Sequence, residues 1–180
     1  MSNLFLRHGE VQNEKDVFYA NLPGFYLSSK GETQAKDAAK KIKKLFNIQK
    51  IITSPLLRAR QTASIVNEEL KIDIEVSHNI IEWSGPYEWI GKTIEEIKLT
   101  DSFKNYKNNP LNLKNTLESL RNVYDRFKLD YEKYENTLFV SHQDTIRAFT
   151  YYYLKEIDFT KNRPVHCEIQ SIENKVINSY

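Results

Sequence analysis

Four residues able to hold or attack a phosphoryl group stand just after short apolar segments of the chain. Arg7 and His8 come directly after one such segment. Arg58 follows a second segment, and His142 follows a third. Guanidinium groups match phosphate oxygens through paired hydrogen bonds, and an imidazole can act as a nucleophile. If these residues meet, they form an anion site, and a phosphoryl group is the anion that they suit best.

The neighbours of these residues also suit anion binding. Gly9 would let the backbone approach a phosphate or adopt a positive φ angle. Ser141 and Asp144 have capping-box spacing, which predicts His142 in the first turn of a helix, near free N–H groups and a partial positive charge. A metal site is the other use of two histidines, but the sequence has no HxH or HxxxH spacing. We therefore expect no metal here.

Short apolar runs that read as β-strands alternate with segments whose apolar residues recur at helical spacing. The expected strands are residues 4–6, 50–53, 72–76 and 137–140, with two more around a turn within 165–177. The expected helices are residues 28–46, 54–70, 113–134 and 142–154. Ser29 and Glu32 could form a capping box for the first helix, and Ser54 is the expected N-cap of the second.

This alternation predicts an α/β fold, namely a three-layer α/β/α sandwich with a mainly parallel central sheet. Right-handed crossovers bring the strand-to-helix loops to one edge of such a sheet, where ligands bind. The loops that carry the candidate residues should therefore converge. We expect one domain over residues 1–180, with lid-like segments at about 11–27 and 77–112. Their aromatic residues would either contact a substrate or pack on one another.

Composition argues against several classes of protein. Hydrophobic residues make up 40% of the chain and charged residues 28%, which suits a packed core rather than a disordered chain. The net charge of +2 predicts neither a nucleic-acid partner nor a membrane surface. Cys167 is the only cysteine, which fits a reducing, cytoplasmic location. We see no signal-peptide pattern and no apolar run near the ~20 residues that span a bilayer.

Five motifs follow one another along most of the chain. They are FLRHGE at 5–10, LSSKGETQA at 27–35, TSPLLRARQTA at 53–63, IIE at 80–82 and VSHQDTIRA at 140–148. In these motifs and their order the sequence resembles the histidine phosphatase superfamily, also called phosphoglycerate-mutase-like, and in particular its small phosphatase branch.

The resemblance implies a phosphohistidine mechanism that uses no metal or other cofactor. His8 is similar to the family's nucleophile. Arg7, Arg58 and His142 are similar to its phosphate pocket, and His142 is also counted as catalytic. Glu82 matches the family's proton-donor position. A carboxylic acid there would protonate the leaving alcohol, and the resulting carboxylate would then activate water.

Two departures from the family pattern leave choices open. Val11 stands after RHGE where many relatives have threonine. Asn13 is therefore expected to supply a phosphate contact, and Gln143 is counted with the phosphate-binding residues. The segment after Glu82 lacks the commoner glycine and WEG spacing, which makes Glu88 a rival for the acid role. Glu82 is favoured because it directly follows an apolar pair and matches by position.

These residues predict a metal-independent phosphomonoesterase of the histidine acid phosphatase type, which forms a phosphohistidine on His8 and acts on a small phosphorylated metabolite. The alternatives are a phosphoglycerate mutase-type isomerase, which is usually longer, and a non-catalytic phospho-ligand binding domain. Lys92 or Lys104 could meet a second anionic group, although solvated lysines are the simpler interpretation. His166 is expected to be structural, and Arg147 a surface or salt-bridging residue. The sequence identifies neither the substrate nor the oligomeric state.

Overall fold

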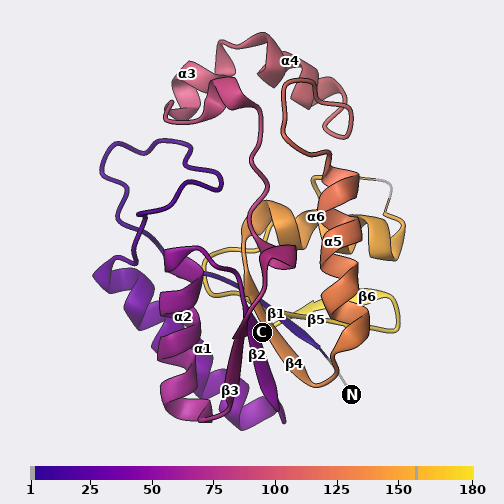
Figure 1. The fold of residues 1–180 in the computed structure, drawn as a ribbon. Coiled ribbons are helices and arrows are strands. Elements are labelled where there is room, and N and C mark those ends of the chain that lie inside the picture. Colours follow the sequence, from indigo (N-terminus) through magenta and orange to yellow (C-terminus); the bar gives the residue numbers. More distant parts are fainter. Residues whose placement is uncertain (1–2, 157) are drawn as a thin grey trace.

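The computed structural model describes residues 3–156 and 158–180, whose strands form a single central sheet (Figure 1). The strands of these residues are β1 Leu4–Arg7, β2 Lys50–Thr53, β3 Asp73–Val76, β4 Thr137–Ser141, β5 Ile169–Glu173 and β6 Val176–Ser179. Their order in the sheet is β3-β2-β4-β1-β5-β6. Strands β1 to β4 pair in parallel, and β5 and β6 extend the sheet as an antiparallel hairpin beside β1. The prediction of a mainly parallel sheet is confirmed.

Successive residues of the central strands face two different helix layers. The long helices are α1 Ser29–Leu45, α2 Leu57–Leu70, α5 Leu120–Lys133 and α6 Gln143–Leu154. Leu4 and Leu6 of β1 pack with α1 and α2 on one face, whereas Phe5 between them packs with α5 and α6 on the other. This period of two is the strand signature. It produces the three-layer α/β/α sandwich that the sequence predicts.

The two faces of the sheet are packed by different kinds of side chain. On the α1 and α2 face, small residues such as Ala38 and Ala63 let the helices approach the sheet closely. On the opposite face aromatic rings fill the space, and the ring centroids of Phe127 and Phe149 lie 4.7 Å apart. Close packing on both faces holds the strands rigidly, so the loops at the strand ends start from fixed positions.

The starts of helices α1 and α5 differ from the sequence prediction. Ser28, not Ser29, is the N-cap of α1, and its Oγ accepts a hydrogen bond from the N–H of Gly31. Helix α5 begins after the N-cap Ser119 rather than near residue 113. Within the described ranges, every helix is too short or too polar to span a bilayer.

Two serines that were expected to cap helices make other contacts. Helix α2 begins at Leu57 with no side-chain cap, so its predicted start at Ser54 was wrong. Ser141 belongs to β4, and its hydroxyl donates to the carbonyl of Ile80 over 2.8 Å. His142 is consequently the N-cap residue of α6 rather than part of its first turn. Both hydroxyls hold neighbouring segments in place instead of capping helices.

Part of the connection between β3 and α5, residues 77–119, forms a cap at one end of the molecule (Figure 1). Within this connection η1 His78–Ile80 packs against α5, and the cap contains η2 Tyr87–Trp89, α3 Ile94–Lys98 and α4 Asp101–Asn108. The loop of residues 8–28, which joins β1 to α1, docks against it. Phe18 donates its backbone N–H to the carbonyl of Lys92 over 2.8 Å, and Val17 forms an antiparallel bridge with Thr93. Two segments far apart in the sequence therefore enclose one space.

Trp89 lies at the centre of the packing inside the cap. Its side chain is 5% exposed, and its ring packs edge-on against Phe18, Phe103 and Tyr106. Its Nε1–H donates to the hydroxyl of Ser102 over 2.6 Å. These aromatic residues of the lid-like segments therefore build a small core of their own, one of the two uses the sequence left open.

Candidate active site

A cavity of about 530 Å³ lies at the carboxyl ends of the parallel strands, between the sheet, the cap and the 8–28 loop. Arg7 and His8 reach its wall from the end of β1. Glu82 reaches it from the cap, and Gln143 from the start of α6. The cavity thus lies at the edge of the sheet where parallel topology predicts a ligand.

His8 is buried, with 2% of its surface exposed. Its Nδ1 lies 2.7 Å from the carbonyl oxygen of Gly9, which can only accept, so Nδ1 carries the proton and Nε2 keeps a lone pair. Burial lowers the pKa of His8 well below its usual value, and the positive charges of Arg58 and Arg7 lower it further. The imidazole is therefore neutral and nucleophilic at ordinary pH.

Two guanidinium groups lie beside His8, and the protein fixes both. Arg7 donates to the carbonyl of Pro164 over 3.0 Å and to Nε2 of His166 over 2.9 Å. Arg58 is fully buried and donates to the carbonyl of Ala20 over 2.6 Å. Fixed guanidinium groups keep a constant geometry and positive charge at the nucleophile, which favours binding of a phosphate.

His142 also lies next to His8, and the two ring centroids are 5.1 Å apart. Its Nε2 lies 2.7 Å from Oγ of Ser54, and that Oγ accepts the N–H of Leu56. If the Ser54 hydroxyl donates its proton to Nε2, the proton of neutral His142 lies on Nδ1. Burial, followed by the charge of Arg58, lowers the pKa of His142 well below its usual value.

Three of these side chains hold a buried nitrogen with no hydrogen-bond partner among the described residues. They are Nε of Arg7, Nε of Arg58 and Nδ1 of His142, and Nη2 of Arg147 is the other atom of this kind. Unpaired buried donors are costly and rare in folded proteins. Their concentration around His8 indicates a site made for an acceptor-rich anion.

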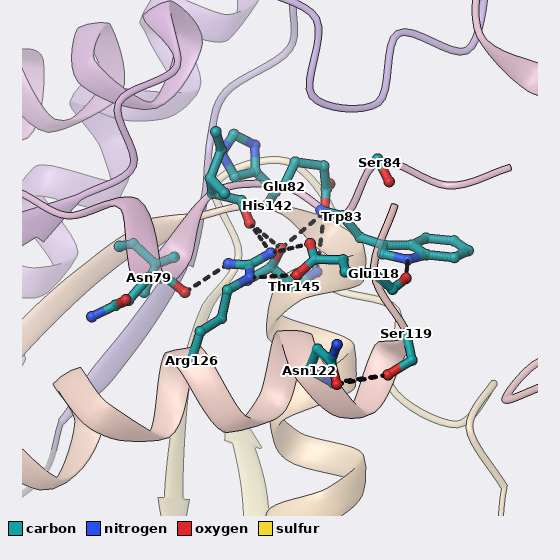
Figure 2. Close-up of polar contacts among 12 residues, drawn as sticks. Asn79, Glu82, Trp83, Ser84, Glu118, Ser119, Asn122, Arg126, His142 and Thr145 are labelled. Carbon is teal, nitrogen blue, oxygen red and sulfur yellow. Dashed lines mark hydrogen bonds and ion pairs between the residues drawn. The ribbon is translucent and has the colours of Figure 1, made fainter. Parts of the chain in front are cut away.

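Glu82 is held so that one of its carboxyl oxygens is occupied. Oε1 accepts hydrogen bonds from the backbone N–H of Trp83 over 2.9 Å and from the N–H and hydroxyl of Thr145 over 3.1 and 3.0 Å (Figure 2). Burial and then the nearby Asp144 raise the pKa of Glu82 to about 7, although Arg58 opposes the shift. At neutral pH a substantial fraction of Glu82 therefore carries a proton, as a general acid requires.

Arg126 fixes the backbone that leads into Glu82. Figure 2 shows its side chain extending from helix α5 toward Asn79 and Glu118. The guanidinium donates to the carbonyls of Asn79 and Ile81 over 2.6 and 2.7 Å, and to both carboxylate oxygens of Glu118 over 2.8 and 3.0 Å. Helix α5 thus holds the backbone just before Glu82 and thereby helps to fix the position of its carboxyl group.

The family model described as histidine phosphatase superfamily (branch 1) matches residues 4–175. The chain belongs to this superfamily. The resemblance noted from the motifs is thereby confirmed, and the histidine phosphatase fold accounts for the parallel sheet with its site at the strand ends.

Two curated relatives are similar to part of this histidine phosphatase. "Uncharacterized protein Rv0525" of Mycobacterium tuberculosis (strain ATCC 25618 / H37Rv) is 36% identical over 46% of this chain and 41% of the relative. "Uncharacterized phosphatase PhoE" of Bacillus subtilis (strain 168) is 32% identical over 67% of this chain and 58% of the relative. The chain therefore spans less than two thirds of the length of either relative.

A mycobacterial glucosyl-3-phosphoglycerate phosphatase is similar in structure. Its solved structure has a TM-score of 0.79 at 20% identity, and the similarity covers 94% of this chain and 88% of that chain. At this identity the similarity shows a shared fold.

Other predicted site residues lie near the cavity in different ways. Gln143 and Asn13 both line it, but the amide of Asn13 is engaged at both ends with the backbone of Val17. The phosphate contacts predicted for these two residues stay predictions. Glu88 is exposed and does not line the cavity, whereas Glu82 does. The geometry therefore favours Glu82 as the acid of this histidine phosphatase.

Gly9 allows a close contact between two backbone segments, and its predicted approach to a phosphate stays a prediction. A Cβ on Gly9 would lie 2.5 Å from the carbonyl oxygen of Gly31, and a Cβ on Gly31 would lie 2.1 Å from the carbonyl oxygen of Glu10. Gly9 has no positive φ angle. The two glycines allow the backbone after His8 to contact the first turn of α1 closely. This contact helps to fix the segment that follows the nucleophile.

His166, which was expected to be structural, lies at the site, and Arg147 contacts a residue of the cavity wall without lining the cavity itself. His166 lines the cavity, its ring centroid is 5.6 Å from that of His8, and burial and Arg7 lower its pKa to about 4. Arg147 is buried and forms an ion pair with Asp144 at 3.1 Å, so it is salt-bridging as expected but not on the surface. His166 lies just before β5, which runs antiparallel to β1. Only its place before an antiparallel neighbour of β1 could have indicated that His166 reaches the cavity.

Proposed function

We propose that this histidine phosphatase is a metal-independent phosphomonoesterase that forms a phosphohistidine on His8. The observation that carries the proposal is the neutral, buried imidazole of His8 beside two fixed guanidinium groups with unpaired N–H donors. A phosphoryl group would supply acceptors for Nε of Arg7, Nε of Arg58 and Nδ1 of His142. These groups would hold its oxygens while Nε2 of His8 approaches phosphorus.

In the first step, Nε2 of His8 attacks phosphorus and the bond to the ester oxygen breaks. The leaving oxygen takes the proton of Glu82, so the alcohol departs uncharged and Glu82 becomes a carboxylate. The negative charge on the transferred phosphoryl oxygens is offset by Arg7 and Arg58. The product of this step is a phosphoramidate on His8.

In the second step, a water molecule attacks phosphorus and the bond to Nε2 of His8 breaks. The carboxylate of Glu82 accepts a proton from that water and regains the acid form. Inorganic phosphate leaves, and neutral His8 is restored. His8 and Glu82 thus act in both steps, and the proposed reaction needs no cofactor.

The relatives support a phosphatase over the alternatives. One relative is described as a phosphatase, and the mycobacterial structure is a glucosyl-3-phosphoglycerate phosphatase rather than a mutase. A non-catalytic binding domain would lack His8 or a pocket arginine, whereas this chain retains them. We propose the histidine acid phosphatase type only in the sense that the reaction passes through a phosphohistidine. The cytoplasmic location stays a prediction.

Trapping the covalent intermediate tests the proposal. Rapid denaturation during turnover of a radiolabelled phosphate ester should leave label on His8 through an acid-labile, alkali-stable bond. His8→Ala should abolish labelling and turnover, while His78→Ala, a change at an exposed histidine, should leave both intact. EDTA should not reduce the rate. Label on Cys167 or a serine, or a requirement for a divalent ion, would contradict the mechanism.

A further inference from the structure

Much of the cavity wall is apolar, and the inference drawn from it about the substrate rests on the proposed function. Apolar side chains from the 8–28 loop and from α3 form much of this wall. They include Val11, Val17, Phe18, Ile94 and Ile97. An alcohol portion that leaves the phosphoryl group would lie against these side chains.

Positive charge is missing from this wall. Among the described residues that line the cavity, Arg7 is the only lysine or arginine, and its guanidinium is fixed beside His8. Lys104 pairs with Asp101 on the surface, and Lys92 does not line the cavity. The two lysines considered from the sequence as partners for a second anion are therefore not placed to bind one.

Negative charge is present instead, in three carboxylates besides Glu82. Glu10 pairs with Lys30 at 2.7 Å, and Asp144 pairs with Arg147 at 3.1 Å. Asp16 lies in the exposed part of the 8–28 loop, and its backbone N–H donates to the carbonyl of Asn13 over 2.9 Å, whereas its carboxylate has no hydrogen bond or ion pair with any described residue. An anionic group on the alcohol portion would meet this unpaired carboxylate and an apolar surface, and among the described residues that line the cavity only Arg7, fixed beside His8, is a lysine or arginine that could offset its lost hydration.

We infer that the substrate is a phosphate monoester whose alcohol portion carries no negative charge, and that Asp16 helps to reject alcohols bearing a carboxylate. Selectivity of this kind comes from repulsion of the wrong substrate as much as from attraction of the right one. The apolar wall suits an alcohol with a hydrocarbon or aromatic part. Esters of the phosphoglycerate type should be poor substrates.

Two esters of one shape and different charge test the inference. In 4-carbamoylbenzyl phosphate and 4-carboxybenzyl phosphate, a neutral amide replaces a carboxylate of nearly the same size. The kcat/KM for the amide should exceed that for the carboxylate by at least about tenfold, and the ratio should fall as ionic strength rises. Glycerol 3-phosphate against 3-phosphoglycerate is a second pair, for which the same order is expected.

Charge changes in the 8–28 loop assign the effect to Asp16. Asp16→Lys should reduce the amide-to-carboxylate ratio by about threefold or more, and Asp16→Asn by less, because asparagine removes the charge without reversing it. Asparagine also tolerates the φ angle of 47° at this position. Glu14→Lys makes the same charge reversal at an exposed residue of the loop outside the cavity wall and should leave the ratio unchanged.

Two further measurements separate this inference from the proposed function. Turnover of p-nitrophenyl phosphate and labelling of His8 report on the phosphatase mechanism whatever the alcohol. Binding of both benzyl esters to His8→Ala reports on the charge preference without chemistry. Equal or tighter binding and turnover of the carboxylate ester would overturn the inference while the phosphatase reaction stands. If His8 is never labelled, the proposed function fails, and weaker binding of the carboxylate ester would still support the charge preference.

Discussion

Burial acts on His8 and Glu82 in the same chemical direction, toward the uncharged form. It lowers the pKa of the imidazole well below its usual value and raises that of the carboxyl group to about 7. A neutral nucleophile and a protonated acid are what the first step of the proposed reaction needs. One physical cause, exclusion of water at the strand ends, therefore prepares both groups.

The role of Glu82 can be tested by changing the leaving group. An alkyl phosphate needs a proton on its departing oxygen far more than p-nitrophenyl phosphate does. Glu82→Gln should therefore lower kcat/KM by about 10²–10⁴-fold for an alkyl phosphate and only slightly for the nitrophenyl ester. Rates of phospho-His8 formation are the measurement, because hydrolysis of the intermediate is common to both substrates. Glu88→Gln is the matched control, and the assignment is wrong if that variant shows the dependence instead.

The raised pKa of Glu82 also predicts a dependence of stability on pH. Between its usual pKa of 4.5 and the native value of about 7, the folded state binds a proton that the unfolded state has released. The free energy of unfolding should therefore fall as pH rises through this window, by roughly 3 kcal/mol at about 1.4 kcal/mol per unit. Urea denaturation of the wild type and Glu82→Gln across this range isolates the contribution. The idea fails if the difference between the two proteins does not change with pH.

At the scale of elements, the site is assembled from the end of β1, the starts of α2 and α6, and the connection between β3 and α5. The convergence of the strand ends was predictable from the sequence. The continuous apolar run of Leu4, Phe5 and Leu6 predicts a strand buried on both faces, and parallel pairing then places His8 and His142 at one edge. The helix caps were not predictable by the same logic. Ser54 and Ser141 have the residue type of N-caps, but their hydroxyls contact His142 and Ile80 across the fold.

The cap was less predictable because residues 77–119 have no sustained periodicity, so contacts distant in sequence decide their structure. The contact of His166 with Arg7 has the same origin. It depends on the antiparallel direction of β5, which brings the residues before that strand to the carboxyl end of β1. The hydrophobic pattern within one strand does not show whether that strand pairs in parallel or antiparallel with its neighbour.

Helix α5 should influence catalysis through Arg126. Arg126→Met keeps the aliphatic bulk but removes the donors to the carbonyls of Asn79 and Ile81. Leaving such partners unpaired should cost about 1–3 kcal/mol of stability. The displaced Glu82 should also lower the rate with an alkyl phosphate more than with p-nitrophenyl phosphate.

A matched control for Arg126 lies on the same helix. Arg121 forms an exposed ion pair with Asp125, and such pairs contribute at most about 1 kcal/mol. Arg121→Met should change neither stability nor leaving-group dependence appreciably. If Arg126→Met affects both substrates equally, its role is structural and the positioning of Glu82 does not depend on it.

At the scale of the whole molecule, the cap should lose its order separately from the sheet. Trp89 holds the cap together through ring contacts and its bond to Ser102, and replacing a buried tryptophan by alanine typically costs about 3–5 kcal/mol. Trp89→Ala should therefore raise KM and speed amide hydrogen exchange in α3 and α4, with little change in β4. Phe46→Ala, far away beside Tyr180, is the control. Uniformly faster exchange throughout the chain would contradict separate behaviour of the cap.

The two connections that build the apolar wall leave and rejoin the framework at the ends of strands and helices. Their length can change without shifting the register of any strand pair, because no residue of β1 to β4 lies within them. Insertions or deletions at these two points can therefore alter substrate range while the phosphoryl chemistry persists. His8 and Glu82 lie near the start of these two connections, and the apolar wall comes from the residues that follow them. Exchanging residues 11–27 and 86–112 together between related chains is therefore a route to transferring selectivity while His8 and Glu82 stay in place.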